Sequence, residues 1–210
     1  MKIDSIRQEY KFSELSEKIN TNPIKLFKKW LNEAIESEVA YPTAMSVSTF
    51  GTDGFPQSRI VLLKFFDKHG FVFFTHYNSE KGRSIYKNPA VGLHFFWPEL
   101  ERQVRISGIA EKTKTEVSEK YFLSRPESSQ IGTWVSEQSK EIPSRKFLDN
   151  RFIELSKQFK NQVPPKPESW GGYLIKPEKI EFWQGRENRL HDRILFEKHD
   201  KIWEIKRLAP

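Results

Sequence analysis

The sequence of 210 residues contains no cysteine, which excludes disulfides and thiolate chemistry. A metal site would therefore need histidines and carboxylates, but the five histidines, at 69, 76, 94, 191 and 199, lack the spacing of metal ligands. The chain also lacks a P-loop, a G-x-G-x-x-G fingerprint and a G-x-S-x-G elbow. We expect no metal, and chemistry that either depends on a bound redox cofactor or is absent.

Long apolar runs are also missing. No run approaches the ~20 residues needed to span a bilayer, and the N-terminal MKIDSIRQEY has no apolar signal-peptide core. We therefore expect a cytoplasmic protein with no membrane partner. The net charge of +7 favours anionic partners: nucleic acid, phosphorylated metabolites or a phosphate-bearing cofactor. Because carboxylates interrupt the basic residues almost everywhere, nucleic acid is disfavoured, and a solvated lysine-rich surface explains most of the charge.

Apolar periodicity predicts one mainly β domain, 23–210, preceded by a flexible polar arm, 1–22. Asn22-Pro23 is typical of a helix start, and Ile24, Phe27, Leu31 and Ile35 repeat at helical spacing after it. Short turns between the strands favour an antiparallel, barrel-like sheet decorated by helices. The predicted strands are 44–50, 58–66, 71–75, 90–97, 102–112, 172–175, 179–183, 193–198 and 202–207, with the first three forming a meander. Further helices are predicted at 79–87, 115–124 and 144–161, the last with Phe147, Phe152, Leu155 and Phe159 inward.

The stretch Arg59–Lys64 holds four branched apolar residues between two cations. Its composition predicts a strand buried on both faces. Since strand side chains alternate, an unbroken strand would send Arg59 and Lys64 to opposite faces. The two cations then serve two separate anions, or one anion and one surface position. The alternative is an ordinary core strand whose ends reach solvent.

Three further groups of polar residues could bind a ligand. Tyr121 and Arg125 share a helix face, and with the nearby Ser129 they could clamp a phosphate, although this spacing is also common on surfaces. The segment 183–193 combines three arginines, a histidine and two carboxylates beside a tryptophan. Its arginines could polarise an anion and its histidine could transfer protons, whereas a lone histidine is more often structural. Gln103 is an amide inside an apolar strand, where a flavin or nucleobase edge would satisfy it.

Ten short strings, spread in order over nearly the whole chain, are specific in combination. They are Arg59–Lys64, Leu100–Val104, Ser124–Pro126, Ser129–Gly132, Trp134–Ser136, Gln138-Ser139, Trp170–Gly172, Ile180–Gly185, Arg189–Arg193 and Arg207–Pro210. Together they resemble the pyridoxamine 5'-phosphate oxidase family. The resemblance implies an FMN-binding split β-barrel and a homodimer with active sites at its interface. It also implies oxidation of pyridoxamine or pyridoxine 5'-phosphate to pyridoxal 5'-phosphate, with electrons passing through FMN to O2 and giving H2O2.

The resemblance also assigns roles to residues. FMN contacts would fall on Arg59, Ile60, Val61, Leu62, Leu63, Lys64, Phe74, Thr75, Lys81, Gln103, Gln138, Ser139, Trp183 and Arg193. The substrate would contact Arg7, Gln8, Glu9, Tyr10, Lys64, Tyr121, Arg125, Ser129, Arg189, Leu190 and His191, with the first four closing as a lid. Arg189 and His191 would be the catalytic pair over the substrate ring. Arg59 would face the flavin phosphate and Lys64 the substrate phosphate.

Two positions depart from the family pattern. Glu80 stands where arginine is frequent and would repel a phosphate if it pointed inward, with Arg83 the candidate to compensate. Phe74 stands where tyrosine is common, so a hydroxyl is lost. The alternatives to an oxidase are a non-catalytic flavin- or pyridoxal-phosphate-binding module, a flavin reductase on the same barrel, and a basic nucleic-acid-binding protein.

Overall fold

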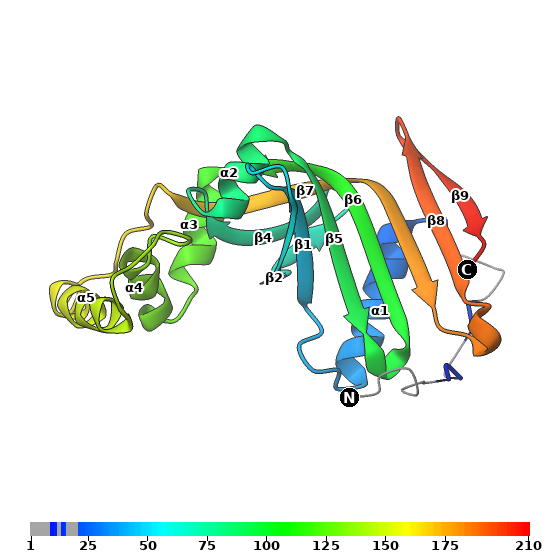
Figure 1. Ribbon diagram of the computed structural model, residues 1–210, viewed down its shortest axis with the longest axis horizontal. Helices are drawn as coiled ribbons and strands as arrows, with labels where there is room; N and C mark the ends of the chain where they lie inside the picture. Colours follow the sequence, from blue (N-terminus) through cyan, green and yellow to red (C-terminus); the bar gives the residue numbers. More distant parts are fainter. Residues whose placement is uncertain (1–8, 12–13, 16–20) are drawn as a thin grey trace.

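The computed structural model describes residues 9–11, 14–15 and 21–210, and these form one curled antiparallel sheet with helices around it (Figure 1). The strands are β1 (Ala44–Phe50), β2 (Pro56–Leu62), β3 (Phe65–Asp67), β4 (Gly70–His76), β5 (Ala90–Trp97), β6 (Arg102–Lys112), β7 (Trp170–Gln184), β8 (Asp192–His199) and β9 (Ile202–Leu208). The helices are α1 (Pro23–Glu36), α2 (Glu80–Lys87), α3 (Thr115–Leu123), α4 (Glu127–Val135) and α5 (Arg145–Gln158). Over the described ranges, no helix has the length and apolar character needed to cross a membrane.

Helix α1 supplies the centre of the hydrophobic core. It begins as predicted, because the Asn22 side chain accepts hydrogen bonds from the backbone N–H groups of Ile24 and Lys25. Phe27 is fully buried, and its ring lies about 5 Å from the rings of Phe66, Phe71 and Phe95. Ile35, expected on the same stripe, is instead 52% exposed at the end of the helix.

The sheet closes on itself through two residues. Its strand order is β2-β1-β5-β6-β7-β4-β3, with β8 added to β7 and β9 to β8, so β2 and β3 lie at opposite ends of the path. Leu63 and Lys64 join these ends. The N–H of Leu63 donates to Thr43 O on the β1 side, and that of Lys64 donates to Val72 O in β4. The predicted split barrel is therefore confirmed.

The predicted course of the stretch Arg59–Lys64 is wrong in two respects. It is not buried on both faces, since Ile60 is 69% and Leu62 42% exposed. The reason is that β2 is the edge strand of the sheet, with nothing from the described chain over its outer face. Nor is it an unbroken strand: β2 ends at Leu62 and β3 begins at Phe65, pairing with β1 and β4 respectively, so the predicted meander does not form.

Two further strand and helix predictions are corrected. The strands predicted at 172–175 and 179–183 are one strand, β7, which a shift in its pairing with β6 near Pro177 carries past the proline. Helix α4 was not predicted. Helix α5 ends at Gln158, and its expected inner residues Phe147 and Phe152 are 40% and 37% exposed, because α5 packs against α4 and not against the sheet (Figure 1).

Candidate functional site

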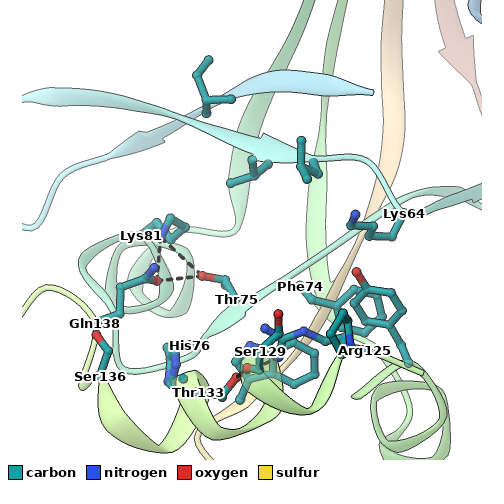
Figure 2. A pocket seen from close by; sticks show the side chains of 17 residues that line it. Lys64, Phe74, Thr75, His76, Lys81, Arg125, Ser129, Thr133, Ser136 and Gln138 are labelled. Carbon is teal, nitrogen blue, oxygen red and sulfur yellow. Dashed lines mark hydrogen bonds between the residues drawn. The ribbon is translucent and has the colours of Figure 1, made fainter. Parts of the chain in front are cut away.

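A cavity of about 660 Å3 lies where the β2–β3 junction, β4 and the helices α2 to α4 approach one another (Figure 2). Eleven of the predicted binding residues line it: Ile60, Val61, Leu62, Lys64, Phe74, Thr75, Lys81, Tyr121, Arg125, Ser129 and Gln138. Its described lining contains three Lys or Arg side chains and no carboxylate. The cavity is therefore suited to an anionic ligand.

One side of the cavity is organised around Lys81. This side chain is only 7% exposed, and its Nζ donates to Gln138 Oε1 (2.9 Å) and Thr75 Oγ1 (3.3 Å). Burial lowers the pKa of Lys81 to about 8, and the nearby charge of Arg59 adds to the effect. A buried ammonium without a carboxylate hydrogen-bond partner is costly, and an anionic group in the cavity would offset that cost.

The neighbours of Lys81 at the start of α2 are Arg59 and Glu80. Arg59 does not line the cavity, and its guanidinium donates to Thr49 Oγ1 (2.8 Å) and Gln57 Oε1 (3.1 Å). Glu80 Oε1 accepts from Gln57 Nε2 at 2.7 Å, and its charge acts on both Arg59 and Lys81. Arg83 donates to the carbonyl of Asn78 and is not among the residues lining the cavity.

The other side of the cavity carries Lys64 and Arg125, as Figure 2 shows. The Arg125 guanidinium lies over the Trp170 ring, 4.9 Å from its centroid, and donates to Thr133 Oγ1 at 2.7 Å. Tyr121 stacks on Phe74 with a centroid separation of 4.1 Å. Phe74 thus holds the Tyr121 ring against the cavity wall, although it lacks the hydroxyl that a tyrosine at position 74 would have. The cations that line the cavity are therefore divided, with Lys81 at one side and Lys64 and Arg125 at the other.

His76 lies on the same cavity wall and was not predicted. Burial lowers its pKa, and the positive charges of Lys81 and Arg125 lower it further, so the ring is neutral at ordinary pH. A signal for it existed in the sequence: Phe74 and His76 are two apart in one strand and so share a face. Thr133, Ser136 and Trp170 also line the cavity without having been predicted.

The predicted catalytic residues lie elsewhere in the protomer, where β7 turns into β8. His191 Nδ1 accepts a hydrogen bond from the backbone N–H of Arg186 (3.1 Å), and its ring lies 4.6 Å from that of Trp183. Burial and the charge of Arg189 lower the pKa of His191, which favours the neutral ring. Because Nδ1 accepts a hydrogen bond, the proton of the neutral ring is on Nε2. Arg189 is exposed, and both it and Asn188 have left-handed backbones (φ 60° and 56°).

The remaining predicted residues also lie outside the cavity. Gln103 Oε1 is 3.0 Å from His94 Nε2, and Arg193 donates to Glu181 and to the carbonyl of Ala209. Leu63 belongs to the hydrophobic core, while Ser139 accepts from the backbone of Glu80. Arg7 and Gln8 lie outside the described residues. In the rest of the predicted lid, Glu9 forms an ion pair with Lys11. Tyr10 lines a second cavity together with Leu190, and the Tyr10 ring packs edge-on against Trp183 and His191.

Comparison with known proteins gives this geometry a family. Residues 31–159 match the family model described as pyridoxamine 5'-phosphate oxidase, more than half of the chain. The chain belongs to the pyridoxamine 5'-phosphate oxidase family. Residues 170–210 match a second model of this family, described as the pyridoxine 5'-phosphate oxidase C-terminal dimerisation region.

Members of the family resemble the chain over its full length. A pyridoxine/pyridoxamine 5'-phosphate oxidase of Flavobacterium johnsoniae is 51% identical over 99% of this chain and 98% of its own. One from Trichormus variabilis is 49% identical over the same shares. Among solved structures, PhzG from Burkholderia lata in complex with tetrahydrophenazine-1-carboxylic acid has a TM-score of 0.87 and 29% identity, over 92% of this chain and 95% of that one. An FMN-binding protein of Nostoc punctiforme, 14% identical with a TM-score of 0.72 over 91% and 100%, shares the fold.

The two family models separate the cavity from the predicted catalytic pair. All the cavity residues except Trp170 fall in the first model, whereas Trp183, Arg189, His191 and Arg193 fall in the dimerisation region. Figure 1 places the turn between β7 and β8 on the side of the molecule away from α4 and α5. Within one chain, the two residues predicted to be catalytic, Arg189 and His191, therefore lie away from the cavity.

Proposed function

We propose that this protein is an FMN-dependent oxidase that converts pyridoxamine and pyridoxine 5'-phosphate to pyridoxal 5'-phosphate and passes the electrons to O2, giving H2O2. Curated relatives that share about half of its residues over the full chain bear the name of this activity. The observation that carries the proposal is that one cavity has cationic side chains at each of its two sides. A reaction between a phosphorylated cofactor and a phosphorylated substrate needs two separate phosphate sites beside one reaction centre.

The residues around Lys81 fit the phosphate of FMN. The Lys81 ammonium and the guanidinium of Arg59 form a local excess of positive charge, which Glu80 offsets in part, and the Thr75 hydroxyl lies beside the ammonium. Charge-assisted hydrogen bonds to a phosphate are the stronger kind. Bound FMN would accept the hydride from the substrate and pass the electrons on to oxygen. The protein's task is to fix the position of the substrate carbon against the flavin and to exclude water.

The residues around Arg125 fit the phosphate of the substrate. Lys64 and Arg125 supply charge on the side of the cavity away from Lys81. Tyr121, whose ring centroid is 6.0 Å from Lys64 Nζ, and Ser129 supply hydroxyl donors. A substrate anchored by its phosphate at this side would extend its ring toward the flavin. In this proposal Arg59 lies near the FMN phosphate and Lys64 at the substrate phosphate. These are the roles that the family resemblance implies for the two residues.

A second protomer would complete the site. We assign to the partner's dimerisation region the task of placing Arg189 and His191 over the substrate ring, because both lie far from the cavity of their own chain. The exposed Ile60 and Leu62 of edge strand β2 give the cavity rim an apolar surface typical of a protein interface. In this arrangement Arg189 supplies positive charge, and neutral His191 donates a hydrogen bond from Nε2. Tyr10, packed on His191, would carry the N-terminal segment over the same site.

Peroxide release tests the function directly. Purified protein reconstituted with FMN should bind the flavin and release H2O2 when given pyridoxamine 5'-phosphate, with matching formation of pyridoxal 5'-phosphate. The protein without FMN is the control. Flavin binding without turnover would identify a non-catalytic module, and flavin-dependent NADPH consumption would identify a reductase; either result contradicts the proposal.

A further inference from the structure

Helix α4 places a buried hydroxyl directly against the guanidinium of Arg125. Thr133 is 6% exposed, and its Oγ1 accepts a hydrogen bond from Arg125 Nη1 at 2.7 Å. The same hydroxyl donates to the backbone carbonyl of Ser129 at 2.9 Å. Because its hydrogen is committed to that carbonyl, the oxygen lone pairs face the arginine. The direction of the hydrogen bond is therefore fixed by the helix.

Other contacts restrain Arg125 in the same position. Its guanidinium packs over the face of Trp170, 4.9 Å from the centroid, and lies 5.8 Å from the centroid of Phe122. Gln130, 5% exposed on the same helix, donates through Nε2 to the backbone carbonyl of Arg125 at 2.8 Å. Helix α4 thus holds both the backbone and the head group of this arginine. Packing against the rings still lets the Arg125 guanidinium rotate within its own plane. The hydrogen bond to the Thr133 hydroxyl restricts this rotation.

The restraint leaves the arginine able to bind a phosphate. A guanidinium has five N–H donors, of which Thr133 takes one. A bidentate contact with a phosphate uses two more. The hydroxyl therefore orients the group without using up its capacity. A long side chain that is already ordered also loses less entropy when its ligand binds.

We propose that Thr133 is a positioning residue that holds Arg125 ready for the phosphate of the substrate, and so favours phosphorylated over unphosphorylated substrates. The inference rests on the proposed function, because it deepens the role of the same cavity. Thr133 acts through Arg125 and through the carbonyl of Ser129, whose own side chain lines the cavity.

Two substitutions isolate the hydroxyl. Thr133→Val keeps the shape and removes the hydrogen bonds, whereas Thr133→Ser keeps the hydroxyl and removes a methyl group. Ordering one long side chain costs about 0.5–1.5 kcal/mol, which corresponds to a rise of roughly twofold to twelvefold in Kd. We expect Thr133→Val to raise the Kd for pyridoxal 5'-phosphate and the KM for pyridoxamine 5'-phosphate by this factor, with kcat within about twofold. Thr133→Ser should resemble the wild type, and oxidation of unphosphorylated pyridoxamine should not change.

A double-mutant cycle decides whether the effect passes through Arg125. In an Arg125→Ala background, Thr133→Val should have no further effect on the Kd for pyridoxal 5'-phosphate, measured by calorimetry on protein whose circular dichroism matches the wild type. Thr133→Ala replaces the valine variant if that one does not fold. An equal loss with and without Arg125, or equal losses in the valine and serine variants, overturns the inference while the proposed function stands. If Arg125→Ala alone leaves pyridoxal 5'-phosphate binding unchanged, the substrate phosphate does not lie at Arg125 and the inference fails, while peroxide release by the wild type still decides the proposed function.

Discussion

The buried ammonium of Lys81 predicts how FMN binding depends on pH. Its pKa is lowered to about 8, chiefly because burial disfavours the charged form. A bound phosphate would raise that pKa again, so binding couples to proton uptake wherever the free protein has lost the proton. The second pKa of a phosphate monoester is about 6, so the phosphate of FMN is almost fully ionised throughout the range from pH 7 to 9. Between pH 7 and 9, the Kd for FMN should therefore rise about tenfold.

The assay is flavin fluorescence quenching over this pH range, with Lys81→Arg as the matched control. A guanidinium stays charged throughout, so the control should show a nearly constant Kd. The stability of the protein without FMN should change in the opposite direction. The folded pKa lies below the unfolded value of 10.5, so the unfolded chain binds more protons between pH 8 and 10.5. The free energy of unfolding, relative to Lys81→Met, should rise with pH across that window. A Kd that rises equally in the wild type and in Lys81→Arg would refute the reasoning.

Three further substitutions probe the charges and the core. Glu80→Gln should lower the Kd for FMN by roughly threefold in a fluorescence titration, because it removes a negative charge that acts on Lys81 and Arg59; weaker binding would contradict this. Arg125→Ala should raise the KM for pyridoxamine 5'-phosphate by roughly 10- to 100-fold, since it removes charged hydrogen bonds, and should change the Kd for FMN less than about twofold. Equal losses would place Arg125 at the flavin. Phe27→Ala should lower the free energy of urea unfolding by about 3–5 kcal/mol, because the side chain is fully buried among three other phenylalanines. A smaller cost would show that the core closes over the gap.

Local patterns predicted the regular parts of the fold well. Strands β1, β5 and β6 have the predicted bounds, because their alternating or apolar residues end at turn residues. Helix α1 was predicted from its cap and period. Helix α4 was missed because ESSQIGTWV contains serine, glycine and β-branched residues, which favour helix weakly. Ile131 and Val135 are buried in a cluster with Phe159, so tertiary packing stabilises this helix.

The exposure of β2 and the division of the site could not be read from residue patterns. A run of branched apolar residues indicates burial, but it does not say whether the covering surface belongs to the same chain. The cavity unites side chains as distant in sequence as Lys64 and Gln138, which only a resemblance to a family brought together. Geometry then separated eleven of the predicted residues, which line the cavity, from those in the dimerisation region.

Mixing two impaired variants, assayed at a pyridoxamine 5'-phosphate concentration near the KM of the wild type, tests most directly whether each site is built from two chains. One variant carries Arg125→Ala, and the other carries Arg189→Ala with His191→Ala. If the cavity of one protomer uses the catalytic pair of its partner, each mixed dimer has one intact site and one doubly altered site. Unfolding and refolding an equal mixture with FMN should therefore restore about a quarter of the wild-type peroxide release per site, as random pairing of a two-fold dimer requires. Activity no higher than the average of the two variants would contradict the account.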